Sequence, residues 1–214
     1  MERGRPARFL MDNITHARGW HSRGYLPHFD GGSIPQSVTF RLADSIPAGR
    51  IDLLENELAC LPKVQAVRER RKTIEEYLDL GLGNAWLKDN RVAEITESAL
   101  LYFDGQRLVL HAWVVMPNHV HALFTPTKGF GLSQILQSWK SFTSKAASAI
   151  LGQSGQFWQE DYFDRYIRNT RHYSATLDYI EMNPVIAGLC KRKEDWQFGS
   201  ARRRQLWTDF KTQT

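Results

Sequence analysis

The chain has 214 residues, which at roughly 150 residues per domain fits one domain with appendages, or two small ones, and excludes a large multidomain assembly. Hydrophobic residues make up 42% of the sequence, enough for a packed core, so the composition excludes an intrinsically disordered chain. The 28 Lys and Arg outnumber the 23 Asp and Glu, for a net charge of +5. This balance permits a polyanionic partner without requiring one.

The two cysteines fit a reducing compartment, and the lack of long apolar runs argues against a membrane span. Cys60 and Cys190 lie far apart and form no C-x-x-C pair, which argues against a disulfide framework or a zinc ribbon. No run reaches the roughly 18 apolar residues of a membrane span, and the first residues, MERGRPARFLMDN, lack the apolar stretch of a signal peptide. We therefore expect a cytoplasmic protein without a membrane partner.

The first half of the chain predicts an arm, a strand and several helices. Residues 1–32 are rich in Gly, Arg, His and aromatic residues without a steady period, and we expect an irregular N-terminal arm. A first strand is predicted over 37–42, and a helix near 50–61 that Pro62 should stop. Charged, helical residues then lead to the Gly81-Leu82-Gly83 break, so the pattern predicts a helical insertion over about 62–90.

The second half alternates strands and helices. After a helix over 90–103, two apolar segments at 107–115 and 119–124 are separated only by Met116-Pro117-Asn118, so they are expected to be neighbours in an antiparallel sheet. A long helix over 132–151 should end at Gly152, and an aromatic and charged block at 157–168 precedes a final helix over 169–182.

Residues 191–214 form a basic C-terminal tail. Its segment KRKEDWQFGSARRR carries six basic residues with Trp196 and Phe198 between them. That mixture suits phosphate contact and base stacking, and it also suits a solvated tail.

Two histidines stand two residues apart in a predicted strand. Residues i and i+2 of a strand project to the same face, so His119 and His121 can aim their imidazoles at one point while Val120 enters the core. This is a geometry of metal ligands. Two ordinary surface or packing histidines are the alternative.

The final helix carries a second pair of polar residues. Tyr179 and Asn183 are four residues apart and share a face of the helix, and Pro184 should bend the helix so that Asn183 lies at an irregular corner. The alternatives are a tyrosine of the core and an asparagine that simply ends the helix.

Three blocks of the sequence resemble the signature blocks of the REP-associated tyrosine transposases, relatives of the single-tyrosine transposases in the HUH superfamily. They are WVVMPNHVHALF at 113–124, FWQEDYFDRYIR at 157–168 and YIEMNPVIAGL at 179–189, and residues 33–61 resemble the opening strand and helix of that family. The resemblance implies a ferredoxin-like α+β fold over 33–190, with an antiparallel sheet, helices packed on it and an HUH endonuclease site.

The resemblance also implies an activity, that of a metal-dependent single-strand DNA endonuclease and strand transferase acting on REP-type hairpin DNA. His119 and His121 would bind Mg²⁺ or Mn²⁺, and Asn183, where some relatives have Gln, would be the third ligand. Tyr179 would be the nucleophile that forms a covalent 5′-phosphotyrosine. A bound cation stabilises the charge that develops on a phosphodiester, and a phenol with a pKa of about 10 needs a base or the field of the metal to react.

Other tyrosines and basic residues complete the expected site. Tyr162 and Tyr166 lie in the block 157–168, which looks structural and DNA-facing, and Tyr173 lies about 120° around the helix from Tyr179, so Tyr179 is the expected nucleophile. The residues expected to contact DNA, each of which could also be a solvated charge or a core aromatic, are Lys140, Lys145, Trp158, Arg165 and Arg168.

Two other functions stay open at this stage. One is a DNA-binding regulator in which the site is present but unused, and the other is a metal phosphodiesterase in which water attacks and no adduct forms. The sequence specifies neither the DNA sequence bound nor a monomer or a homodimer, and it leaves open whether Tyr179 meets the histidines of its own chain.

Overall fold

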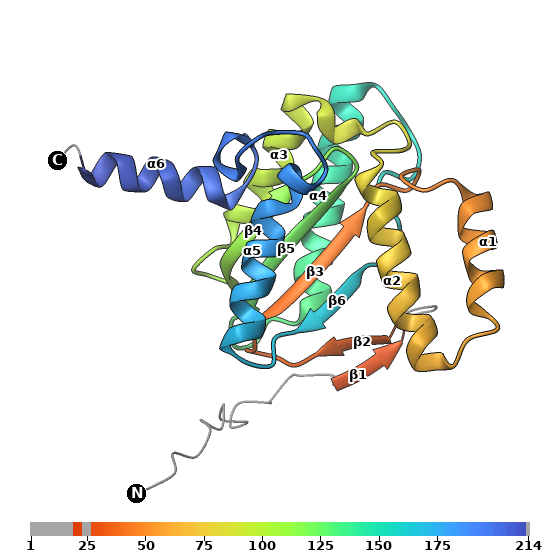
Figure 1. Cartoon of the computed structure of the whole chain (residues 1–214). Coiled ribbons are helices and arrows are strands. Elements are labelled where there is room, and N and C mark those ends of the chain that lie inside the picture. Colours follow the sequence, from red (N-terminus) through yellow and green to blue (C-terminus); the bar gives the residue numbers. More distant parts are fainter. Residues whose placement is uncertain (1–18, 23–26, 213–214) are drawn as a thin grey trace, which may run out of the picture.

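The computed structural model describes residues 19–22 and 27–212, and its centre is a four-stranded sheet with helices on both faces (Figure 1). The strands are β1 (Gly19–Ser22), β2 (Pro27–Asp30), β3 (Gln36–Arg41), β4 (Leu108–Val115), β5 (His119–Pro126) and β6 (Phe163–Tyr166). The α-helices are α1 (Ala48–Leu58), α2 (Lys63–Asp79), α3 (Asn90–Tyr102), α4 (Leu132–Leu151), α5 (Thr170–Ile186) and α6 (Ser200–Thr212). Two short 3₁₀ turns are η1 (Trp86–Lys88) and η2 (Lys193–Asp195). Over these described residues, no helix has the length and apolar character that crossing a membrane requires.

The central sheet has the strand order β4-β5-β3-β6, and every neighbouring pair is antiparallel. The first of these strands in the chain, β3, therefore lies inside the sheet, while β4 and β6 form its edges. With a helix leading into β4 and another into β6, this is a ferredoxin-like arrangement, and the predicted α+β class is confirmed. The predicted pairing of the two apolar segments is also confirmed, as β4 and β5.

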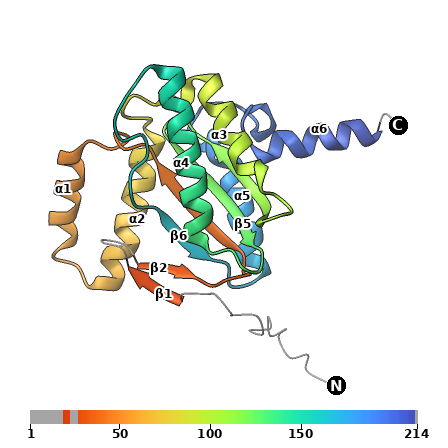
Figure 2. The same cartoon turned by 180° about the vertical axis from the view of Figure 1, so that it is seen from behind.

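Helices α3 and α4 cover one face of the sheet and form the main core with it (Figure 2). Alternate residues of β3 and β5, among them Phe40 and Phe124, point to this face, and the fully buried Trp139 of α4 packs on both rings. The predicted bounds of α4 are correct. Gly152 ends it with a φ of 64°, a left-handed conformation that glycine adopts without steric cost.

Helices α2 and α5 lie on the opposite face (Figure 1). Ile180 of α5 packs on β4 and β5, while Ile74 and Leu78 of α2 pack around Phe163 of β6. Helix α1 packs on α2, so these two helices form a pair between β3 and α3. Helix α3 is the one that crosses over to β4. The helix predicted near 50–61 is α1, and the segment 62–90, predicted to be a helical insertion, contains α2 and η1. Apolar periodicity shows that a helix has a buried face but not which side of the sheet it covers.

The expected irregular arm contains two paired strands. β1 and β2 form an antiparallel pair, and β2 packs against β6 at the edge of the main sheet. His28 of β2 is buried and bonded to Asp161 and Asp164. The rest of the arm, residues 1–18 and 23–26, lies outside the described residues.

The expected basic tail is partly fixed against the edge strand β4. The backbone N–H of Val115 donates to Phe198 O at 2.9 Å, and the indole of Trp196 donates to Val115 O at 3.0 Å. Phe198 is buried, so base stacking by this ring, and a solvated tail at this point, are both wrong. The physical reason is that β4 has unpaired backbone groups on its outer edge. Beyond this segment α6 extends away from the body of the molecule (Figure 1).

Candidate active site

Two histidines of β5 meet on the sheet face that α2 and α5 flank. In the register of β3 and β5, Thr39 lies opposite His121 and Arg41 opposite His119, and directly opposed side chains point to the same face of a sheet. His119 and His121 are 1% and 2% exposed, and their Nε2 atoms lie 3.0 Å apart. The two rings thus converge on one point, as their i, i+2 spacing predicts.

The orientation of His119 is set by the residue before it. Asn118 donates through Nδ2 to the carbonyls of Leu78 and Leu82, each at 3.2 Å, so its Oδ1 faces His119 Nδ1 at 2.8 Å. An amide oxygen only accepts, so His119 Nδ1 carries the proton and Nε2 carries a lone pair. Because Leu78 lies in the last turn of α2, this helix takes part in orienting the histidine.

His121 is held by the neighbouring strand. Its Nδ1 lies 2.7 Å from Thr39 Oγ1. Burial lowers the pKa of His121 well below its usual value, with further lowering by His119 and Arg71, and burial also lowers the pKa of His119 to about 3. Both rings are therefore neutral at neutral pH, which is the form of imidazole that binds metal ions.

Helix α5 brings Tyr179 and Asn183 over the histidines. The Asn169 side chain caps its first turn, as predicted, but the helix continues to Ile186 with Pro184 inside it. The predicted end at 182, with Asn183 at an irregular corner, is wrong. An internal proline removes one backbone hydrogen bond, and the ladder resumes where Ala187 N donates to Asn183 O at 2.9 Å.

Tyr179 lies against His121 of its own chain. Its ring centroid lies 5.6 Å from that of His121, with the planes at 77°. Asn183 is 1% exposed, and its side chain lies close enough to act on the pKa of both His119 and Tyr179 as a hydrogen-bonding neighbour. Neither of its amide atoms, however, has a hydrogen bond of good geometry to a described residue.

The surroundings of Tyr179 keep its phenol protonated. Burial raises the pKa of Tyr179, and the negative charges of Glu75 and Asp79 on α2 raise it further, while Arg71 opposes them. These three residues of α2 were not expected from the sequence, because no motif marks the helix that carries them.

The other tyrosines lie elsewhere. Tyr173 packs on His111 of β4 at 5.5 Å between ring centroids. Tyr162 is buried beside His28 at 4.3 Å, and Tyr166 packs on Phe29 at 4.8 Å.

The histidine pair and Asn183 could hold a divalent ion. Among the described residues no three His, Cys, Asp or Glu side chains form a metal-binding group, so an ion here would rest on two imidazoles and an amide. Two ligand atoms each about 2.1 Å from an ion and at right angles are about 3.0 Å apart, which matches the two Nε2 atoms. The buried amide of Asn183 lacks the partner that such groups normally have. The donor set fits an ion that keeps further positions for water or substrate oxygen.

Two of the expected DNA contacts lie at the edge of this site. Arg165 and Arg168 are exposed, and Arg165 lies opposite Ser37 on the sheet face of the histidines. The charges of Arg71 and Arg168 lower the pKa of Arg165, after burial as the main cause. Three arginines therefore gather where α2, β6 and the start of α5 meet.

Trp158 is a core residue, so the expectation that it stacks on DNA is wrong. It is 5% exposed, its indole donates to Thr143 Oγ1 at 2.8 Å, and its ring meets Phe40 edge-on at 4.8 Å. The aromatic residues at the start of the block 157–168 close the core, and only its charged end reaches the site.

Lys140 and Lys145 lie on the wrong side of the sheet for the site. Both are on α4, which covers the face opposite the histidines (Figure 2). Lys140 donates to the carbonyls of Gln159 and Glu160, each at 2.7 Å, and so holds that loop, whereas Lys145 is exposed. Both lysines therefore lie away from the histidines, and contact of either one with DNA stays a prediction.

Comparisons with known proteins find matches that include the residues of this site. Residues 84–183 match the family model described as "Transposase IS200 like", a range that contains both histidines, Tyr179 and Asn183. The "REP-associated tyrosine transposase" of Escherichia coli (strain K12) is 32% identical over 94 residues, which are 44% of this chain and 54% of that protein. The chain thus spans about half the length of this curated relative.

A solved structure shows the same fold. The structure of a REP-associated tyrosine transposase bound to a REP hairpin superposes with a TM-score of 0.53 and 20% identity, covering 86% of this chain and 82% of the other. These matches confirm the resemblance to the REP-associated tyrosine transposases that the sequence motifs indicate, with the IS200-like transposase family matched over residues 84–183.

Proposed function

We propose that this protein is a transposase-type nuclease that cuts and rejoins single-stranded or hairpin DNA of the REP type. Tyr179 would be its nucleophile, and Mg²⁺ or Mn²⁺ would be held by His119, His121 and Asn183. One observation carries the proposal: Tyr179 and the unpaired amide of Asn183 lie against two converging, neutral imidazoles. The names of the relatives support the class of DNA, since one is REP-associated and another is bound to a REP hairpin.

The chemistry follows from these residue types. When bound, a divalent ion would polarise a nonbridging oxygen of the phosphodiester and stabilise the charge of the in-line displacement. Asn118 and Thr39 fix the two imidazoles, and the i, i+4 spacing of Tyr179 and Asn183 places the phenol beside them.

Attack by the phenol exchanges one phosphodiester bond for another and so conserves its energy. The bond from Tyr179 Oη to phosphorus forms as the bond from phosphorus to the 3′ oxygen breaks, and the proton that the phenol loses is balanced by the one that the 3′ oxygen gains. The products are a 5′-phosphotyrosine and a free 3′-hydroxyl. Attack of a 3′-hydroxyl on the phosphotyrosine reverses the step and joins a strand without ATP.

The test is the formation of a covalent adduct. Purified protein is incubated with an end-labelled REP-derived hairpin that has single-stranded flanks, with Mn²⁺ or with EDTA, and separated by denaturing electrophoresis. We expect a metal-dependent adduct with the parent protein and none with Tyr179→Phe. Tyr173→Phe changes the same chemical group on the same helix, away from the histidines, and is expected to leave the adduct unchanged.

Each alternative has its own result in this assay. An adduct that persists in Tyr179→Phe would overturn the choice of nucleophile. Cleavage without an adduct would favour attack by water, and DNA binding without either product would favour a regulator.

A further inference from the structure

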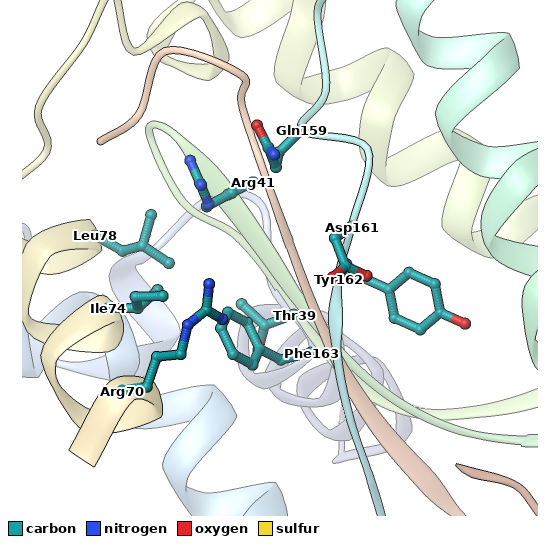
Figure 3. Close-up of a pocket in the computed structure, with 9 residues that line it drawn as sticks. All are labelled: Thr39, Arg41, Arg70, Ile74, Leu78, Gln159, Asp161, Tyr162 and Phe163. Atoms are coloured by element: carbon teal, nitrogen blue, oxygen red, sulfur yellow. The ribbon is translucent and has the colours of Figure 1, made fainter. Parts of the chain in front are cut away.

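A small pocket of about 50 Å³ opens beside the histidine pair, between α2 and β3 (Figure 3). It shares a wall with the site, because Thr39, which bonds to His121, also lines the pocket. Figure 3 shows that Arg41 of β3 and Arg70 of α2 reach into the space between the two elements.

Arg41 has no anionic partner in the described structure. Its Nη1 donates to Ser45 Oγ at 3.0 Å and to Leu42 O at 3.5 Å, but no carboxylate of the described residues lies within the 4.0 Å of an ion pair. Burial lowers the pKa of Arg41 to about 10, and the charge of Arg70 lowers it further, while Asp161 opposes both. A half-buried guanidinium without an anion is costly to the folded state unless a ligand supplies the charge.

The carboxylates around the pocket already have other partners. Asp161 accepts from His28 at 2.8 Å, and Glu55 pairs with Arg70 at 2.6 Å. These pairs hold both walls of the pocket in place, and the charge of Asp161 offsets that of Arg41 only in part, without a direct ion pair.

We propose that Arg41 binds a backbone phosphate of the DNA substrate, next to the phosphate at the histidines, with Arg70 on the opposite wall as a second contact. This inference rests on the proposed function. Arg41 lies opposite His119 on the neighbouring strand and on the same sheet face, and neighbouring strands are about 4.8 Å apart, so one DNA strand can contact both. The guanidinium fork matches phosphate oxygens, and the pocket is too small for a nucleoside.

The first test measures binding without cleavage. The affinity of the REP-derived hairpin is measured by fluorescence anisotropy in EDTA at several salt concentrations for the parent, Arg41→Gln and Arg68→Gln. Arg68 is exposed on α2 and is the charge-matched control. We expect Arg41→Gln to weaken binding by about 10- to 100-fold and to reduce the salt slope by about one, and Arg68→Gln to stay within about twofold of the parent.

The second measurement changes the DNA instead of the protein. A methylphosphonate, which lacks the negative charge, replaces each phosphate around the cleavage position in turn. At one position the methylphosphonate should weaken binding to the parent about as much as Arg41→Gln does. The same methylphosphonate should weaken binding to the Arg41→Gln variant only slightly further. If at every position the loss of affinity from the methylphosphonate simply added to the loss from Arg41→Gln, Arg41 would not contact any of these phosphates. This conclusion would hold even if the variant were poorly folded.

A stability measurement separates a binding role from a structural one. Because Arg41 lacks an anionic partner, Arg41→Met is expected to keep or raise the thermal unfolding midpoint, whereas a fall of several degrees would make Arg41 a structural residue. A parent that forms the adduct while Arg41→Gln binds DNA normally would refute this inference alone. A parent that neither binds nor cleaves the hairpin would refute the proposed function.

Discussion

Asn183 is a buried amide without a hydrogen bond of good geometry to any described residue, a situation that costs about 1–3 kcal/mol in a protein interior. Its place beside both His119 and Tyr179 suggests that the cost is tolerated for the sake of a ligand. We therefore expect Asn183→Leu to raise the thermal midpoint of the metal-free protein, because it removes an unpaired polar group. The same change should reduce the rise in the midpoint that Mn²⁺ produces in the parent, since ligand binding stabilises by mass action.

The neighbouring residue supplies the control for that measurement. Met182 is on the same helix and 37% exposed, so Met182→Leu should leave the response to Mn²⁺ unchanged. If Asn183→Leu responded to Mn²⁺ as strongly as the parent does, the amide would not be a ligand.

At the scale of elements, the loop between α2 and η1 connects the helix pair α1–α2 to the histidines. The carbonyl of Leu82 in this loop accepts from Asn118, which orients His119. Gly83 has a φ of +80°, and a Cβ there would collide with the backbone carbonyl of Asp44. Gly81 has a φ of +64° with open space around it.

The two glycines give a matched pair of substitutions. Gly81→Ala should cost about 1–2 kcal/mol, the ordinary penalty of a left-handed alanine, and leave the site intact. Gly83→Ala should cost more and also displace the loop, which weakens Mn²⁺ binding by about 10- to 100-fold, as the loss of a group that supports a metal ligand typically does. The Mn²⁺ affinities of the two variants are measured by titration at the same denaturant concentration. Equal affinities would show that the loop does not support His119.

The same elements show where prediction from the sequence succeeds and where it stops. Local signals sufficed for α4, which ends at Gly152, and for the β4-β5 pair around its short corner. The i, i+2 spacing also predicted that His119 and His121 converge, and the i, i+4 spacing that Tyr179 and Asn183 share a helix face, whereas the family resemblance implied that the two pairs form one site. Packing partners could not be predicted, because periodicity shows that a side chain is buried but not what it meets. Trp158 therefore turned out to be core, and the charged face of α2 was missed.

At the scale of the whole molecule, the buried His28 helps to tie the N-terminal strands to the rest. His28 of β2 lies between Asp164, at 2.5 Å from Nδ1, and Asp161, at 2.8 Å from Nε2. Asp164 also accepts from the backbone N–H of Phe29 at 2.9 Å. Because Asp161 lines the pocket of Arg41, this ion-pair cluster joins the strand pair β1-β2 to the wall of the proposed phosphate site.

The charge of His28 should make stability depend on pH in a defined direction. Burial opposes the charged ring, but the bonds to Asp161 and Asp164 outweigh it and raise the pKa of His28 to about 9. The folded state therefore holds the proton more tightly than the unfolded chain, whose histidine has a pKa of about 6.5. This contribution, up to about 3 kcal/mol, is fully present below about pH 6.5 and is lost as the pH rises through about 9. Thermal unfolding of the parent and of His28→Gln should thus differ strongly at pH 6 and converge near pH 9.5. A difference that stayed constant across this range would mean that His28 is held as a neutral ring, and the strand pair would then be anchored by packing and neutral hydrogen bonds rather than by charge.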